Sequence, residues 1–105
     1  MNRKELLGKR IKELRKAKRF TQEYLAEKLN IETRQLSKLE TGKHYPSFET
    51  IVALLETFNM TFEELTAFEH LDSYENIKQK LQNEINSFDE KQTTMIYKLI
   101  RNLTV

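Results

Sequence analysis

The chain of 105 residues contains no cysteine and no tryptophan, only two glycines and a single proline. Without cysteine it can form neither disulfide bonds nor thiolate metal sites, and this composition is compatible with a reducing compartment. So few chain breakers argue against strands joined by tight turns and favour a helical protein.

Long apolar runs and catalytic motifs are missing as well. No stretch approaches the ~20 apolar residues that cross a bilayer, and the first ten residues, MNRKELLGKR, contain no signal-peptide run. We therefore expect a cytoplasmic protein without membrane contact. The sequence has no nucleophile elbow, glycine-rich phosphate loop or HExxH motif, and His44 and His70 stand alone. We expect neither an enzyme nor a cofactor nor a metal site.

Charge is distributed unevenly along the chain. Residues 1–45 contain 13 Lys and Arg against 6 Asp and Glu, whereas residues 46–105 contain 5 against 10. A basic first half suggests a polyanionic partner for that half.

Apolar residues recur at helical spacing along the whole chain. The expected helices of the first part span about 3–18, 22–29, 33–41, 48–58 and 62–68. Thr21 and Ser47 suit the N-cap position, and TFEE at 61–64 is a capping box. Asn30 and Gly42 suit the left-handed residue that ends a helix.

The C-terminal part, residues 70–105, reads as a helical hairpin. Its apolar residues follow a helical seam, and SFDE at 87–90 predicts a capping box between the two helices. We expect an all-α protein with a five-helix domain over residues 1–69 followed by this hairpin. The seam residues expected at a dimer interface are Tyr74, Ile77, Leu81, Ile85, Leu99 and Leu103.

The segment LNIETRQLSKLETGKHYP, residues 29–46, contains a short helix with unusual outward residues. A very short link joins it to the preceding helix, so the two helices cross steeply, and Ala26 allows a close approach. This is the helix-turn-helix arrangement, whose second helix enters the DNA major groove. If Leu36 and Leu39 are buried, four polar residues lie within about 50° of the outward direction. They are Arg34, Ser37, Lys38 and Thr41.

These residue types suit DNA. Arginine binds O6 and N7 of guanine, hydroxyl groups donate or accept, and a threonine methyl can contact a thymine methyl. Phosphate contacts outnumber base contacts in such interfaces, so a phosphate contact by Arg34 stays an alternative.

The segment from Thr21 to Leu65 resembles the phage-repressor/Cro-like (XRE-type) helix-turn-helix family. The resemblance rests on TQ-x-x-LA-x-x-L, L-x-K-x-E-x-G in register, the pair P-S and the closing MTFEEL. With the first helix it covers about residues 3–68. It implies a five-helix DNA-binding domain that usually works as a dimer. Asn30 stands at the usual glycine of the turn, and Glu32 at a common Ser or Thr cap.

The resemblance assigns roles residue by residue. It implies that Thr33, Arg34 and Lys38 read bases, while the helical phase adds Ser37. It also implies a salt bridge between Arg15 and Glu40 that brings Arg15 near the DNA backbone. The residues expected at the DNA backbone are Gln22, Thr41, Lys43, His44 and Arg15.

Together these patterns predict a sequence-specific transcription regulator, a homodimeric repressor that reads a two-fold symmetric operator on double-stranded DNA. The alternative is an antitoxin or a regulator whose residues 70–105 hold a protein or peptide, with autoregulatory DNA binding.

Overall fold

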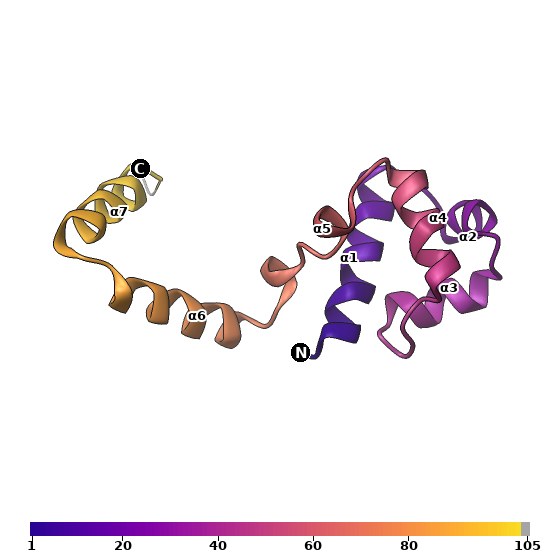
Figure 1. Cartoon of the computed structure of the whole chain (residues 1–105), viewed down its shortest axis with the longest axis horizontal. Helices are drawn as coiled ribbons and strands as arrows, with labels where there is room; N and C mark the ends of the chain where they lie inside the picture. Colours follow the sequence, from indigo (N-terminus) through magenta and orange to yellow (C-terminus); the bar gives the residue numbers. More distant parts are fainter. Residues whose placement is uncertain (104–105) are drawn as a thin grey trace. The chain divides into compact units, whose positions relative to one another are not determined.

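The structure, a computed structural model, describes residues 1–103 and contains only helices in that range. Two compact units divide between Asp72 and Ser73. The prediction of an all-α fold is confirmed, and no helix within residues 1–103 is long and apolar enough to span a bilayer. The elements are α1 (Arg3–Ala17), α2 (Gln22–Leu29), α3 (Thr33–Glu40), α4 (Phe48–Phe58), α5 (Phe62–Leu65), the 3-10 turn η1 (Glu69–Leu71), α6 (Tyr74–Ser87) and α7 (Glu90–Leu103) (Figure 1).

Hydroxyl caps begin α2, α4 and α5 where the sequence predicted them. Thr21 Oγ1 accepts from the Tyr24 N–H at 3.0 Å, and Ser47 Oγ accepts from the Thr50 N–H at 3.2 Å. At α5 the capping box is present in both directions, because Thr61 and Glu64 each accept from the other's backbone N–H. These caps satisfy donors that have no partner inside the helix.

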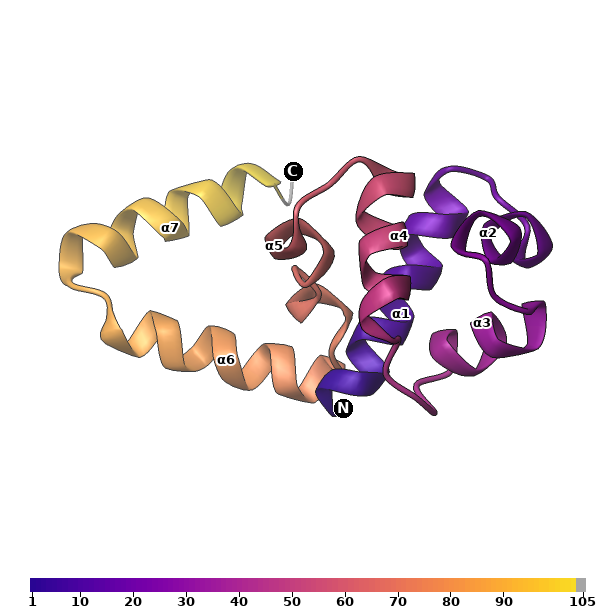
Figure 2. The same ribbon diagram turned by 45° about the vertical axis from the view of Figure 1, so that its right-hand side comes forward.

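The core of the first unit gathers one or more side chains from each of its five α-helices. Its largest fully buried members are Ile11, Leu25, Leu36, Leu54 and Leu65. In both overall views α2 and α3 lie on the side of α1 and α4 that is away from α5 (Figures 1 and 2). The core therefore places α3 at one end of the first unit. The side of α3 opposite the buried Leu36 faces away from the core.

Two glycines allow α1 to approach α3 and the loop after it. A Cβ at Gly8 would fall on the carbonyl oxygen of Leu39, so only glycine fits this contact. Gly42 has φ 76°, as expected for a helix stop, and a Cβ there would lie 2.8 Å from Cα of Glu5.

Contacts from α1 and from the N-terminal amine hold α5 and the segment that follows it. Arg10 donates to the carboxylate of Glu13 at 2.7 Å and to the carbonyl of Glu64 at 2.7 Å. His70 Nε2 lies 2.9 Å from the same Glu13 carboxylate, and the N-terminal amine lies 3.4 Å from Asp72. Residues up to Asp72 thus belong to the first unit.

The second unit is the hairpin of α6 and α7, which diverge from their turn (Figure 2). The predicted capping box at 87–90 is wrong by two residues. Ser87 remains in α6, where its hydroxyl donates to the Glu84 carbonyl at 2.6 Å. Asp89 instead caps α7: it accepts from the Gln92 N–H at 2.8 Å, while the Gln92 side chain accepts from the Asp89 N–H. Aspartate and serine are comparable N-cap residues, but α6 continues through Ser87, so Asp89 is the residue that directly precedes α7.

Candidate nucleic-acid interface

The turn between α2 and α3 consists of only three residues, 30–32. Asn30 adopts the left-handed conformation, with φ 56° and ψ 43°, as the sequence predicted. The N–H of Ile31 then donates to the Ala26 carbonyl at 3.0 Å, and Ala26 itself is only 1% exposed. A small side chain at this point lets the two helices cross closely, which completes the helix-turn-helix.

The start of α3 is closed by a contact that the sequence analysis missed. Glu32 is the N-cap residue, and its N–H donates to Oε1 of Gln35 at 3.1 Å. The Glu-x-x-Gln spacing has the form of a capping box and could have revealed it. The Gln35 side chain is therefore committed to capping the N-terminus of α3.

The two sides of α3 differ in character. Leu36 is fully buried and Leu39 is 7% exposed, so the core side is apolar. Arg34 is exposed, while Thr33, Ser37 and Lys38 are half-buried along the outward side. The structure thus brings these four predicted base-reading residues together on one helix, away from the core.

The loop after α3 holds the predicted backbone contacts in a fixed conformation. The Lys43 N–H donates to the Lys38 carbonyl at 3.0 Å, and Thr41 Oγ1 donates to the Ser37 carbonyl at 2.9 Å. Lys43 and His44 are exposed. The Thr41 hydroxyl hydrogen is directed back to its own helix, so this group is left as an acceptor.

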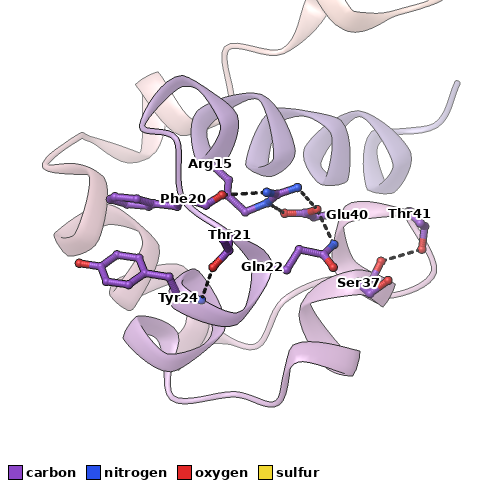
Figure 3. A network of polar contacts seen from close by, with 8 residues as sticks. All are labelled: Arg15, Phe20, Thr21, Gln22, Tyr24, Ser37, Glu40 and Thr41. Carbon is purple, nitrogen blue, oxygen red and sulfur yellow. Dashed lines mark hydrogen bonds and ion pairs between the residues drawn. The ribbon is translucent and has the colours of Figure 1, made fainter.

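A buried carboxylate joins the first three helices (Figure 3). Glu40 of α3 accepts from Arg15 of α1 through Nε at 2.7 Å and Nη2 at 3.1 Å. The same carboxylate accepts from Gln22 Nε2 of α2 at 2.9 Å, and Arg15 Nη1 donates to the Phe20 carbonyl at 2.9 Å. The salt bridge expected between Arg15 and Glu40 is therefore present.

The burial of Arg15 changes its expected role. Its residue exposure is 9%, and all three guanidinium nitrogens donate within the protein. We therefore do not assign Arg15 to the DNA backbone, because a phosphate would have to compete with a buried carboxylate. Gln22 is half-buried with one amide hydrogen committed to Glu40, so only its remaining groups are free to reach a phosphate.

Exposed cations also lie on α1 and in the turn after it. They are Arg3, Lys9, Lys12, Lys16, Lys18 and Arg19. Within residues 1–103 no group of three His, Cys, Asp or Glu could hold a metal ion. The side chains of this surface can therefore donate hydrogen bonds and attract an anion.

Comparison with known proteins agrees with this geometry. The family described as Helix-turn-helix matches residues 11–65, more than half of the chain. The chain belongs to this family. The resemblance to phage repressors is confirmed by the Immunity repressor protein of Bacillus phage phi105, which is 34% identical over 85 residues covering 81% of this chain.

Two further relatives of this helix-turn-helix protein are transcription regulators by name. The activator BcrR of Enterococcus faecalis is 38% identical over 61% of this chain, and the regulator ImmR of Bacillus subtilis is 39% identical over 56%. The chain spans 31% to 55% of the length of these three relatives.

Solved structures show the same fold. The restriction-modification controller protein C.AhdI from Aeromonas hydrophila is 30% identical, with a TM-score of 0.55 over 58% of this chain and 92% of that one. The clp gene regulator ClgR from Corynebacterium glutamicum reaches 0.64 over 82% of this chain and 88% of that one, at 21% identity. The helix-turn-helix unit of this chain thus shares its family and fold with proteins that are transcription regulators by name.

Proposed function

We propose that the helix-turn-helix protein is a homodimeric repressor that reads a two-fold symmetric operator in the major groove. One observation carries the proposal: the outward side of α3 presents Arg34, Thr33, Ser37 and Lys38 together, while Leu36 is fully buried. Arginine, lysine and hydroxyl side chains on a helix of this size are suited to base edges and phosphates.

A single helix-turn-helix unit offers a small surface to DNA. Single modules bury about 600–1,000 Å² of protein surface, less than most specific complexes. Two copies that dock on two half-sites double that surface, and their own symmetry then requires a two-fold symmetric operator. The match to an immunity repressor extends over 81% of this chain and supports repression, whereas the activator BcrR matches over 61%.

Selection of DNA from a random library by the purified chain tests the proposal. We expect an enriched site with two symmetric half-sites about one helical turn, ~34 Å, apart. The double variant Arg34→Ala, Lys38→Ala serves as a matched control that keeps the buried side of α3 and should lose the enrichment. An enriched site with one unrepeated half, bound by one chain, would contradict the homodimer.

A reporter gene separates repression from activation. With the selected operator placed across a promoter, expression should fall when the wild-type chain is supplied and should recover with the control variant. A rise in expression would show an activator.

A further inference from the structure

Helix α4 has a second apolar stripe beside the one that enters the core. Four apolar residues lie between about 60° and 160° around the helix from the fully buried Leu54, at 100° per residue. They follow the i, i+3, i+4 and i+7 spacing of a helix that packs against a neighbour, and they are Phe48, Ile51, Val52 and Leu55. Phe48 is 76% exposed and Val52 is 37% exposed, while Ile51 and Leu55 are half-buried. The stripe is therefore open to solvent over about two turns of the helix.

Two surface hollows follow this stripe in succession. The first contains Ile51 together with Tyr45 from the loop before α4 and Phe62 of α5. The second contains Leu55, which lies about one helical turn after Ile51, together with Met60. The stripe, Tyr45 and Phe62 together form the α4–α5 surface.

Large aromatic side chains are the most exposed part of the α4–α5 surface. Tyr45 is 61% exposed, Phe48 is 76% exposed and Phe62 is 55% exposed. Exposed apolar side chains gathered in this way mark an interaction site, and aromatic residues are enriched in the centre of protein interfaces. The 11 residues of α4 extend about 16 Å. An elongated apolar strip of this length matches the side of a second helix better than a compact small molecule.

Carboxylates border the α4–α5 surface. Residues 46–69 contain five glutamates and no lysine or arginine. Three of these glutamates line the two hollows, Glu69 in the first and Glu56 and Glu64 in the second, whereas Arg3 is the cation that lines the first. The surface therefore combines an apolar centre with a net negative border.

The negative border favours one kind of occupant. It would repel the phosphates of DNA, and it would also repel a second copy seated on the same surface, because a two-fold interface brings identical patches together. A positively charged helix with an apolar stripe of its own would instead gain apolar contact and charge complementarity at once.

We propose that the α4–α5 surface binds a basic amphipathic helix of a partner protein. The apolar stripe of that helix lies against Phe48 and Phe62, and its cations lie beside Glu56 and Glu69. The inference goes beyond the proposed function, because none of these residues belongs to the proposed DNA contacts.

Binding of a labelled synthetic peptide to the full chain tests the proposal. The probe is an amphipathic helix of about 18 residues built from leucine and lysine, with leucines at i, i+3, i+4 and i+7. Fluorescence anisotropy should show saturable one-to-one binding with a Kd on the order of micromolar. The same peptide with glutamate in place of lysine should bind at least about tenfold more weakly, because it meets the carboxylates of the surface. Equal affinities for the two peptides would overturn the proposal.

Paired variants locate the peptide on the chain. Phe48→Ser with Phe62→Ser should weaken binding at least about tenfold, since both side chains are exposed and belong to the proposed contact. Tyr97→Ser with Leu103→Ser removes two side chains of α7 that are 63% and 83% exposed, and it should leave the affinity unchanged. Circular dichroism should show equal helix content for both double variants. An equal loss of affinity in the two would contradict binding at α4 and α5.

A second pair of variants tests the charges of the border. Glu56→Gln with Glu69→Gln should weaken peptide binding at least about threefold and reduce its dependence on salt. Glu84→Gln with Glu90→Gln makes the same change in net charge at exposed positions of the hairpin and should have neither effect. If both pairs weakened binding equally, net charge alone would attract the peptide and the proposed site would be wrong.

Sedimentation equilibrium without peptide or DNA tests the competing occupant. The variant Phe48→Ser with Phe62→Ser should have the same oligomeric state as the wild-type chain. A wild-type dimer that became monomeric in this variant would overturn the proposal and assign the surface to a second copy. None of these measurements contains DNA, so their failure is separate from a failure of operator selection.

Discussion

Two arginines of the first unit illustrate how surroundings decide the role of a residue. Arg34 is exposed on the outward side of α3, whereas Arg15 is 9% exposed and bound to Glu40. An exposed guanidinium keeps its planar donors for a base or a phosphate, while a buried one has already used them. The first is suited to recognition and the second to holding the helices.

At Arg34 we predict a loss of both affinity and selectivity. Arg34→Ala should weaken operator binding by about 1–3 kcal/mol and relax the preference at one base pair per half-site, because a bidentate contact to guanine is lost. Binding to a panel of single-base operator variants measures both effects.

Lys43→Ala is the comparison for this prediction, since Lys43 is exposed on the loop after α3. It should weaken all sequences about equally, as expected for a phosphate contact. If Arg34→Ala also weakened every sequence uniformly, Arg34 would be a phosphate contact.

At Glu40 we predict a loss of stability. Glu40→Ala leaves the Arg15 guanidinium buried without its carboxylate, and removing one partner of a buried pair typically costs about 3–5 kcal/mol. Urea unfolding of the full chain should show this loss, whereas Glu27→Ala, at an exposed position on α2, should change stability by less than about 0.5 kcal/mol. Equal midpoints for the two variants would mean that the ion pair contributes little.

At the scale of elements, α3 is held from two directions. The Glu40 carboxylate ties it to α1 and α2, and Gly8 lets its last turn approach the backbone of α1. The helix itself has only eight residues, too few to be stable in isolation. Its position therefore comes from these contacts and from the burial of Leu36.

Gly8→Ala should destabilise the chain although alanine is the better helix former. The propensity gain is about 1 kcal/mol, but the added methyl would overlap the Leu39 carbonyl, and such overpacking costs about 1–3 kcal/mol. Thermal unfolding should show a lower midpoint for Gly8→Ala and a slightly higher or unchanged one for Lys9→Ala. A midpoint that rises with Gly8→Ala would show that α1 and α3 can separate at low cost.

The contacts of Glu13 on α1 with Arg10 and with His70 on η1 should stabilise the chain less as the pH falls. Burial raises the pKa of Glu13, but hydrogen bonds and charges of Arg10 and His70 lower it more, so the pKa lies below its ordinary 4.5. A carboxylate with a lowered folded pKa adds stability above its unfolded pKa and loses it as pH falls through the folded value. Because Glu13 is 36% exposed, the effect should be about 0.5 kcal/mol or less.

Comparison of wild type with Glu13→Gln at several pH values measures this contribution. The wild-type chain should be the more stable at pH 6, and the two should converge as the pH falls through the lowered pKa of Glu13. A difference that persists at pH 3 would mean that Glu13 acts through packing rather than through its charge.

Sequence patterns predicted those elements whose signals are local. Thr21, Asn30 and Ser47 act within a turn of their own position, so residue type and spacing sufficed. The start of α7 was misjudged because SFDE offers two acceptors, and Asp89 rather than Ser87 caps the helix. The helical phase also agrees with the burial of Leu36 and the exposure of Arg34 and Thr41, whereas Ser37 and Lys38 are half-buried.

Contacts between distant segments could not be read from the sequence. The approach of Gly8 to Leu39 and the pairing of His70 with Glu13 join residues far apart in the chain. Neither has a periodic or capping signature. The Arg15–Glu40 pair was expected only because the family resemblance supplied it, and even then the burial of Arg15 was not foreseen.

At the scale of the whole molecule, the positive and negative charges are concentrated in different segments of the chain. The positive excess lies in residues 1–45, and residues 46–69 contain five glutamates and no lysine or arginine. The hairpin segment 70–105 is balanced, with five basic and five acidic residues. The negative excess of the second half therefore belongs to residues 46–69, which contain α4 and α5.

Operator binding should consequently depend steeply on salt. With roughly six or more phosphate contacts, affinity should fall about a thousandfold between 50 and 200 mM salt. Titrations of a labelled operator at several salt concentrations measure the slope. Lys43→Ala should reduce the slope by about one contact, and a flat dependence would contradict DNA binding through the basic segment.

The separation of roles along α3 makes its specificity exchangeable. Leu36, Leu39 and Glu40 are buried and hold the helix, while Thr33, Arg34, Ser37 and Lys38 lie on the outward side. Under the proposed function, the second set can be changed to recognise new operators while the buried set, and with it most of the stability, is kept. A duplicated gene, or a designer, would need to change only these four residues to alter the operator that is recognised.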